Sequence, residues 1–307
     1  MALSDASIRA ENVDGIAFTR GPGMAGCLAV CSNAARTLAA ALNKPLVGVH
    51  HMQAHALTAA LTTPEDQLPQ FPFLTLLISG GHTLIVLANS QTSFRILAST
   101  KDESIGRAFD DVARMLGLSW STHGLGAALE RFCNQPTDTS AASEGIPEFP
   151  SVLRGKLEFS YSALHAHVER FLRSRDRPLD ELSKLALARA FQDAAFTQLE
   201  EKLTLALNRC RQKGINIGTV VVSGGVASNL YLRDMLRKRL DEYSAGGEPI
   251  GLLFPPPSLC TDNAAMIGWA SMHRFLAEDI DEYTVDILPK WSIEDITEKK
   301  PHREQNP

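Results

Sequence analysis

The order strand, glycine turn, helix, strand near the start of the chain is the feature that most limits its fold. Residues 15–19 are apolar and β-prone, and Gly21-Pro22-Gly23 follows them as a turn. An Ala- and Leu-rich helix is then predicted over 24–42, and a second apolar strand over 45–49. Because parallel strands need a crossover connection, this order predicts a βαβ unit within an α/β fold.

Two later strands end in a Ser-Gly-Gly turn. Strands predicted over 71–78 and 83–88 are joined by Ser79-Gly80-Gly81-His82, and a strand over 219–222 runs into Ser223-Gly224-Gly225 before a predicted helix. Two such turns are what a protein with two lobes around a nucleotide requires. The length of 307 residues also favours two domains over one.

The charge balance limits how the chain can hold nucleic acid. It has 30 Lys and Arg against 35 Asp and Glu, a net charge of −5, so any nucleic acid must bind a local patch. The segment 154–177, with a local charge of +3, is a candidate patch, and the first alternative is a solvated helix face. Its basic residues are Arg154, Lys156, Arg170, Arg173, Arg175 and Arg177.

Cysteine usage and hydropathy exclude two further classes. Five cysteines without a CxxC pair argue against a dense disulfide framework. The most apolar stretches, 27–49 and 71–88, are interrupted by polar residues, so we expect no membrane span and no membrane partner.

His51 and His55 are candidate metal ligands. Four residues apart on a predicted helix, they project from one face. The alternative is one surface histidine and one core histidine. Met52 stands where the HExxH pattern of zinc proteases has its glutamate, so this is not such a site. Asp262 is a candidate third ligand, or else an ordinary acid at a helix N-terminus.

The glycine turns and one acidic pair are candidate nucleotide-binding elements. The turn 79–83 can form an anion-binding nest or a simple hairpin. The turn 223–226 can bind an anion or a ribose edge, or serve as a tight turn before a helix. Asp110 and Asp111 lie on a predicted helix. They are a solvated pair, or one of them binds a ribose or a polar acyl group.

Taken in order, the motifs resemble one family. They are His-His-Met-Gln-Ala-His at 50–55, Ile-Ser-Gly-Gly-His-Thr at 78–83, the segment 102–118, Phe-Ser-Tyr-Ser-Ala-Leu at 159–164, Val-Val-Ser-Gly-Gly-Val-Ala-Ser-Asn at 221–229, and Thr-Asp-Asn-Ala-Ala-Met-Ile-Gly at 261–268. This succession resembles the tRNA N6-adenosine threonylcarbamoyltransferase family over about residues 13–270, and its mitochondrial branch in particular.

The resemblance implies a fold and some departures from it. The fold is α/β, of the actin-like, Hsp70-like and sugar-kinase-like type, with lobes at 1–99 plus 263–307 and at 100–262 and a nucleotide cleft. The family's first strand and phosphate loop, which precede Gly15, are absent, so we expect the first lobe to be incomplete at its start. Thr122-His123-Gly124-Leu125 replaces a Gly-Gly-Pro-like turn. Ala163 and His165 stand where Gly and Lys are usual.

By motif, the resemblance also implies site residues. His51, His55 and Asp262 correspond to the catalytic ligands of one divalent metal ion, zinc or iron. The positions that correspond to the adenylate-binding residues are Ser79, Gly80, Gly81, His82, Thr83, Asp110, Gly124, Gly224, Gly225 and Asn229.

The implied reaction transfers the L-threonylcarbamoyl group from threonylcarbamoyl-AMP to N6 of the adenosine next to the tRNA anticodon. Implied partners are tRNA and either a homodimer or a tRNA-modification complex, in mitochondria or the cytoplasm. Two alternatives stay open. One is a kinase or another carbamoyltransferase of the same fold, and the other is an inactive truncated relative that binds nucleotide or acts as a scaffold.

Overall fold

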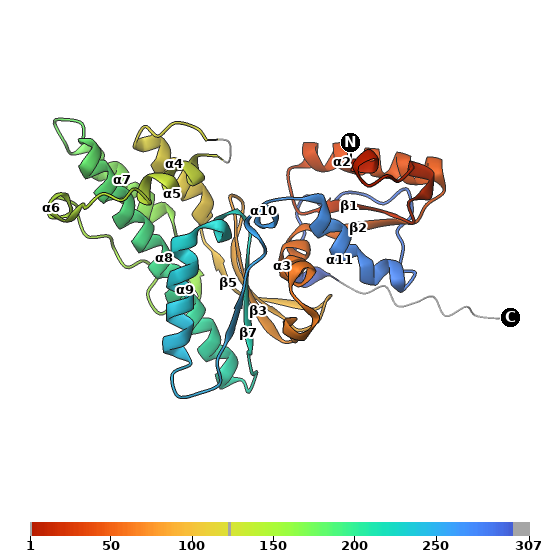
Figure 1. The fold of residues 1–307 in the computed structure, drawn as a ribbon. Coiled ribbons are helices and arrows are strands. Elements are labelled where there is room, and N and C mark those ends of the chain that lie inside the picture. Colours follow the sequence, from red (N-terminus) through yellow and green to blue (C-terminus); the bar gives the residue numbers. More distant parts are fainter. Residues whose placement is uncertain (1, 122–123, 297–307) are drawn as a thin grey trace. The chain divides into compact units, whose positions relative to one another are not determined.

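The computed structural model describes residues 2–121 and 124–296 and forms two compact units (Figure 1). Unit 1 comprises the described parts of Met1–Leu68, Ala88–Arg95 and Asp262–Pro307. Unit 2 comprises those of Pro69–Leu87 and Ile96–Thr261. The predicted lobes, 1–99 plus 263–307 and 100–262, stay a prediction. Thr122 and His123, half of the noted turn, lie outside the described residues.

Unit 1 contains the expected βαβ motif. Strands β1 (Ile16–Gly21) and β2 (Leu46–His50) pair in parallel, with Ile16 opposite Leu46, and helix α2 (Ala25–Leu42) connects them. Helix α3 (His51–Thr62) follows β2 directly, and α11 (Ala264–Leu276) packs along α3. The shorter elements are α1 (Ala2–Asp5), η1 (Ala10–Asn12), η2 (Glu65–Gln67) and η4 (Ile293–Asp295).

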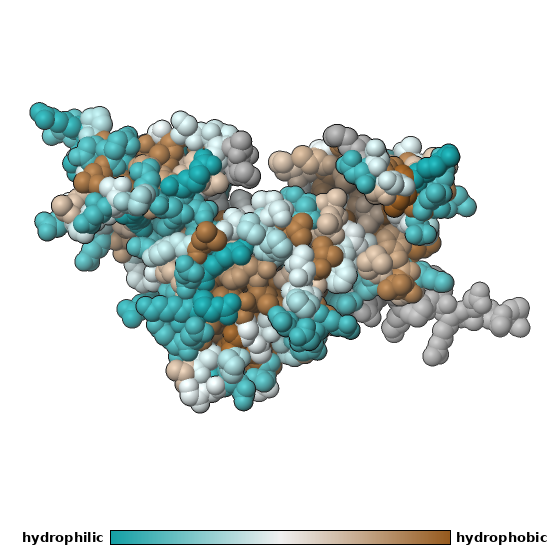
Figure 2. Space-filling model, in the orientation of Figure 1, coloured by the Kyte–Doolittle hydropathy of each residue, from teal (hydrophilic) through white to brown (hydrophobic). Residues whose placement is uncertain are grey.

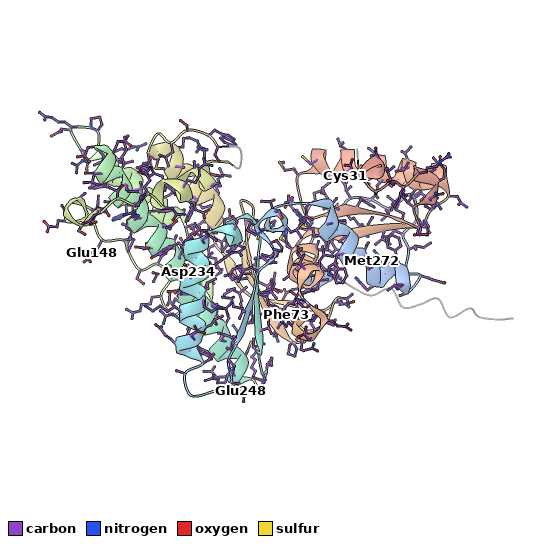
Figure 3. All side chains as sticks on the ribbon, viewed as in Figure 1. Cys31, Phe73, Glu148, Asp234, Glu248 and Met272 are labelled. Atoms are coloured by element: carbon purple, nitrogen blue, oxygen red, sulfur yellow. The ribbon has the colours of Figure 1, made fainter. Side chains whose placement is uncertain are left out.

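Helix α2 buries one side only. Its buried residues are Leu28, Ser32, Ala35 and Ala39, whereas Cys31 is exposed (Figure 3). Among the described residues, α2 is long and apolar enough to cross a membrane by length and composition. One such helix is weak evidence, because core helices meet the same criterion. The expectation of no membrane span therefore stays a prediction.

Unit 2 is built on a six-stranded sheet with the order β6-β5-β4-β3-β7-β8. The pairs β3/β7, β5/β6 and β7/β8 are parallel, so this is the α/β class predicted. The bounds are β3 (Phe73–Ile78), β4 (Thr83–Ala88), β5 (Phe94–Thr100), β6 (Glu158–Phe159), β7 (Thr219–Ser223) and β8 (Gly251–Leu253).

Helices pack on this sheet around one large apolar core. Polar side chains cap several of them: Ser104, Asp180 and Asn229 each accept a backbone N–H of the first turn. Helices α8 and α9 lie side by side (Figure 1). The helices are α4 (Ile105–Met115), α5 (Leu125–Cys133), α6 (Ser140–Ser143), α7 (Ser162–Arg173), α8 (Glu181–Gln212), η3 (Gly225–Ser228), α9 (Leu230–Tyr243) and α10 (Pro257–Cys260).

Candidate metal and nucleotide sites

The two histidines lie at the junction of β2 and α3. His50 ends the strand, and its Nδ1 accepts hydrogen bonds from the backbone N–H groups of Met52 and Gln53 at 3.1 and 3.4 Å. This side-chain cap starts the helix at the next residue. His51 and His55 therefore project from the same face, with ring centroids 4.9 Å apart. The prediction that they share a helix face is confirmed.

Asp262 meets both histidines, although more than 200 residues separate it from them. It stands just before Asn263, the N-cap of α11, and α11 packs along α3 within unit 1. Asp262 Oδ1 lies 3.1 Å from His51 Nε2 and 3.0 Å from His55 Nε2. Hydrogen bonds from His51 and His55 hold the pKa of this carboxyl well below its usual range. The three predicted ligands thus converge.

The donor set of these three residues fits a divalent metal ion. Each offers one ligand atom, and the atoms lie within 4.8 Å of one another. Two imidazole nitrogens and one carboxylate oxygen are ligands that zinc and ferrous iron accept, with coordination positions left open. The His55 side chain is only 3% exposed and that of His51 18%, so the imidazoles are held in place by their surroundings.

The Ser79–Thr83 turn in unit 2 is fixed from within. The Oγ of Ser79 accepts hydrogen bonds from the N–H groups of Gly81 and His82 at 3.2 and 3.1 Å. Ser104 Oγ donates to the carbonyl of Gly80 at 2.6 Å. These contacts make a hairpin turn whose amides are engaged by its own serine, so a ligand would have to compete with that serine for them.

Two glycines bring other elements against this turn. A Cβ on Gly106, in the first turn of α4, would lie 2.6 Å from the carbonyl oxygen of Ser79. A Cβ on Gly224, after β7, would lie 2.2 Å from the carbonyl oxygen of Ile78. The two Gly-Gly turns, distant in sequence, are therefore neighbours at the ends of β3 and β7. Gly225 continues the second turn into η3.

Asn229, Asp110 and Gly124 form the rest of the predicted nucleotide set. Asn229 is buried; its Oδ1 accepts from Leu232 N–H and its Nδ2 donates to Gln192. Asp110 Oδ1 accepts from the N–H of Gly126 at 2.7 Å, beside Gly124, the N-cap of α5. All of these predicted residues lie in unit 2, and their role in binding a nucleotide stays a prediction.

Sequence reasoning missed one anchoring residue, Asp102. Its carboxylate accepts hydrogen bonds from Ser160 Oγ, Tyr161 N–H and Ser162 Oγ, and so ties the start of α7 to the segment before α4. Burial acts to raise the pKa of Asp102, but these hydrogen bonds outweigh it and lower the pKa. In the sequence, the serines of the Phe-Ser-Tyr-Ser motif are the only feature that could have predicted this contact with Asp102.

The six basic residues of the segment 154–177, around β6 and α7, are exposed. In Figure 2 the surface at this end of unit 2 is mainly hydrophilic. Part of its charge is already paired, because Arg173 lies 2.6 Å from Glu169. Arg175 lies over the ring of Phe171. The alternative that these residues form an ordinary solvated helix face therefore stays open.

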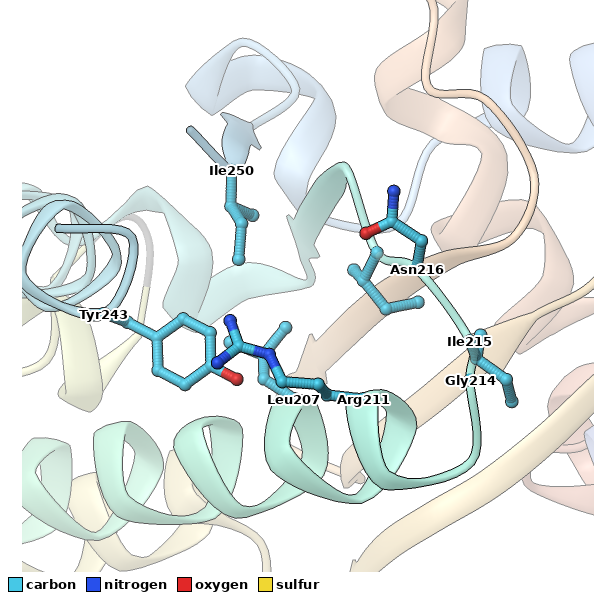
Figure 4. Close-up of a pocket in the computed structure, with 8 residues that line it drawn as sticks. Leu207, Arg211, Gly214, Ile215, Asn216, Tyr243 and Ile250 are labelled. Carbon is cyan, nitrogen blue, oxygen red and sulfur yellow. The ribbon is translucent and has the colours of Figure 1, made fainter. Parts of the chain in front are cut away.

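A separate hollow of about 260 Å³ opens in unit 2 (Figure 4). Arg211 lies over the ring of Tyr243, 4.9 Å from its centroid, and Leu207 and Ile250 complete an apolar wall. None of the predicted site residues lines it. The chemistry predicted from the motifs is therefore not placed in this hollow.

The arrangement of helices and strands places the chain in the α/β class. Unit 2 is a mixed-sheet α/β body, and most of the chain is similar in fold to part of HypF. It matches the T. kodakarensis HypF crystal structure with a TM-score of 0.58 at 16% identity, over 91% of this chain and 42% of that one. Full-length HypF in a phosphate- and nucleotide-bound form matches with a TM-score of 0.52 at 17% identity, over 79% of this chain and 45% of that one. The expected α/β fold is confirmed.

Sequence comparison then gives the family. Residues 1–269 match the family model described as tRNA N6-adenosine threonylcarbamoyltransferase. The chain is 40% identical over 288 residues to the mitochondrial tRNA N6-adenosine threonylcarbamoyltransferase of Schizosaccharomyces pombe. This match covers 92% of this chain and 68% of that protein. The chain belongs to the tRNA N6-adenosine threonylcarbamoyltransferase family.

Proposed function

We propose that this protein transfers the L-threonylcarbamoyl group from threonylcarbamoyl-AMP to N6 of the adenosine next to the anticodon of tRNA. The observation that carries the proposal is the family match over residues 1–269. The family is one of transferases that act on tRNA. The convergence of His51, His55 and Asp262 supports the proposal, because a transferase needs a fixed reactive centre.

We assign the metal to this centre in unit 1. His51 and His55 would bind it through Nε2, and Asp262 through its carboxylate, which stays ionised because its pKa is low. A bound zinc or ferrous ion supplies Lewis-acid polarisation of a carbonyl or phosphate oxygen. The His50 cap holds the first turn of α3, so it orients both imidazoles before any substrate arrives.

We assign the adenylate to unit 2. The turns at Ser79–Thr83 and Gly224-Gly225 adjoin each other, and glycine there permits close approach of a ligand to the backbone. The side chain of Asp110 is the group proposed to accept hydrogen bonds from ribose hydroxyls. The reaction needs the amine of adenine to be positioned against the acyl carbon, and such positioning by itself removes a large part of a reaction barrier.

We further propose a mitochondrial location, since the curated relative is a mitochondrial protein. For assembly we propose a homodimer or a tRNA-modification complex. Sedimentation of the purified chain, alone and with tRNA, separates a monomer from a dimer and tests the assembly directly.

The decisive experiment is a transfer assay with threonylcarbamoyl-AMP and unmodified tRNA. We expect modified adenosine from the native chain, and loss of both bound metal and product from the His51→Ala/His55→Ala variant. His167→Ala removes an imidazole outside both sites and should keep both. Transfer by metal-free enzyme would refute the metal assignment. ATP-dependent phosphorylation would favour a kinase, and nucleotide binding without any product would favour the inactive scaffold.

A further inference from the structure

A second cluster of metal-ligating side chains lies in unit 2. Glu103 stands just before the N-cap of α4, Asp111 lies on the second turn of α4, and His165 lies in the first turn of α7. One ligand atom from each of the three lies within 4.8 Å of the others. The cluster exists because α4 packs against α7. It is separate from the histidine pair, which belongs to unit 1.

The three side chains are partly buried, and two of them are in contact. His165 Nδ1 is hydrogen bonded to Glu103 Oε1. The side chains of Glu103, His165 and Asp111 are 13%, 22% and 23% exposed. Burial raises the pKa of Glu103; contact with His165 opposes this rise, and the nearby charge of Asp111 adds to it. Two facing carboxylates thus share a partly desolvated position, which a dication would stabilise.

Two arginines supply the positive charge that now faces Asp111. Arg114 Nη1 lies 2.5 Å from Asp111 Oδ1, and Arg107 Nε lies 3.9 Å from Oδ2. Their side chains are 63% and 71% exposed. Ion pairs this exposed are weak, so either guanidinium can withdraw into water when a cation takes the carboxylate.

We propose that Glu103, Asp111 and His165 form a second divalent-cation site, for an ion of the Mn²⁺ or Zn²⁺ class. Two carboxylate oxygens and one imidazole nitrogen are the mixed hard and borderline donors that these ions accept. Three protein ligands leave positions open for water or an anion. The neighbouring Ser104 hydroxyl holds the carbonyl of Gly80, so the ion would lie beside the Ser79–Thr83 turn.

Mn²⁺ binding, followed by electron paramagnetic resonance, tests the proposal without any activity measurement. Thiols bind Mn²⁺ poorly, so the exposed cysteines do not interfere. The titration uses the His51→Ala/His55→Ala variant, which lacks the ligands of the first candidate site. We expect it to bind one equivalent of Mn²⁺. No bound Mn²⁺ in this variant would overturn the proposal.

Further substitutions in that background locate the ion. Glu103→Gln and Asp111→Asn keep the side-chain shape, and each should abolish Mn²⁺ binding while the circular dichroism spectrum is unchanged. Glu158→Gln removes a nearby acid that pairs with Lys101 and should have no effect. Retention of the bound ion in both ligand variants would also overturn the proposal.

The competing arginine gives a test of opposite sign. Arg114→Gln removes a cation from Asp111 and leaves the three ligands in place. It should tighten Mn²⁺ binding about two- to fivefold, the equivalent of one exposed ion pair. If the contact between His165 and Glu103 is purely structural and binds no metal, Arg114→Gln would not increase the affinity for Mn²⁺. That result would count against the site.

Discussion

Substitution of Gly224 by Ala should be among the most damaging single-methyl changes in unit 2. The backbone of Gly224 has φ 102° and ψ 164°, a region that only glycine adopts readily. In addition, the new Cβ would lie 2.2 Å from the carbonyl oxygen of Ile78. That atom is backbone in the buried strand β3, so it has no rotamer through which to move away.

The expected magnitude is the sum of these two effects. The backbone region costs about 1–3 kcal/mol for a residue other than glycine. Forced overpacking adds about 1–3 kcal/mol. Gly124→Ala is the matched control, because Gly124 has φ 95° and ψ 179° but, its chain neighbours aside, no heavy atom of the described residues within 4 Å of an added Cβ. It should show the backbone cost alone.

The assay is urea denaturation of both variants and the native chain, followed by circular dichroism and tryptophan fluorescence. We expect Gly224→Ala to lower the free energy of unfolding by about 1–3 kcal/mol more than Gly124→Ala. The variant should also bind adenylate more weakly, since the turn beside Ser79 must shift. Equal losses in the two variants would refute the close approach of β7 to β3.

Three further predictions concern anchoring contacts and thiols. Asp102→Asn should destabilise the chain by about 1–2 kcal/mol at pH 7, through weaker hydrogen bonds. Because the folded-state pKa of Asp102 lies below 3.8, this difference should be complete above about pH 5 and should vanish as the pH falls through the folded-state pKa. Lys202→Met should cost about 3 kcal/mol, since the fully buried ammonium binds the Leu153 carbonyl and the Glu201 carboxylate. Two thiols, those of Cys27 and Cys31, should react with a disulfide reagent in the native chain, and all five in urea.

Controls accompany these predictions. Lys184→Met breaks a partly exposed ion pair with Glu181 and should cost less than about 1 kcal/mol. A difference between Asp102→Asn and the native chain that grew in acid would contradict the direction of the pKa shift. Rapid reaction of Cys133 in the native chain would contradict its burial, which raises the pKa of its thiol to about 12.

Local patterns predicted much of the fold. The βαβ unit and the strand before each Gly-Gly turn follow from apolar periodicity and glycine placement, and the structure contains both. Elements with a weak local signal were missed, namely β5 (Phe94–Thr100) and α5 (Leu125–Cys133). The helix predicted after the Ser223-Gly224-Gly225 turn begins only at Leu230, because η3 comes first and Asn229 caps α9.

The sequence by itself determined which residues are candidates, because helical spacing puts His51 and His55 on one face whatever the rest of the chain does. Only the tertiary structure decided that Asp262 joins them, that Gly224 meets Ile78, and that Glu103 lies against helix α7. Such contacts depend on how helices and strands distant in sequence pack, and a local pattern carries no information about that packing. Unit 1 brings α11 against α3, and unit 2 brings α4 against α7, and those two packings create the two clusters of potential metal ligands.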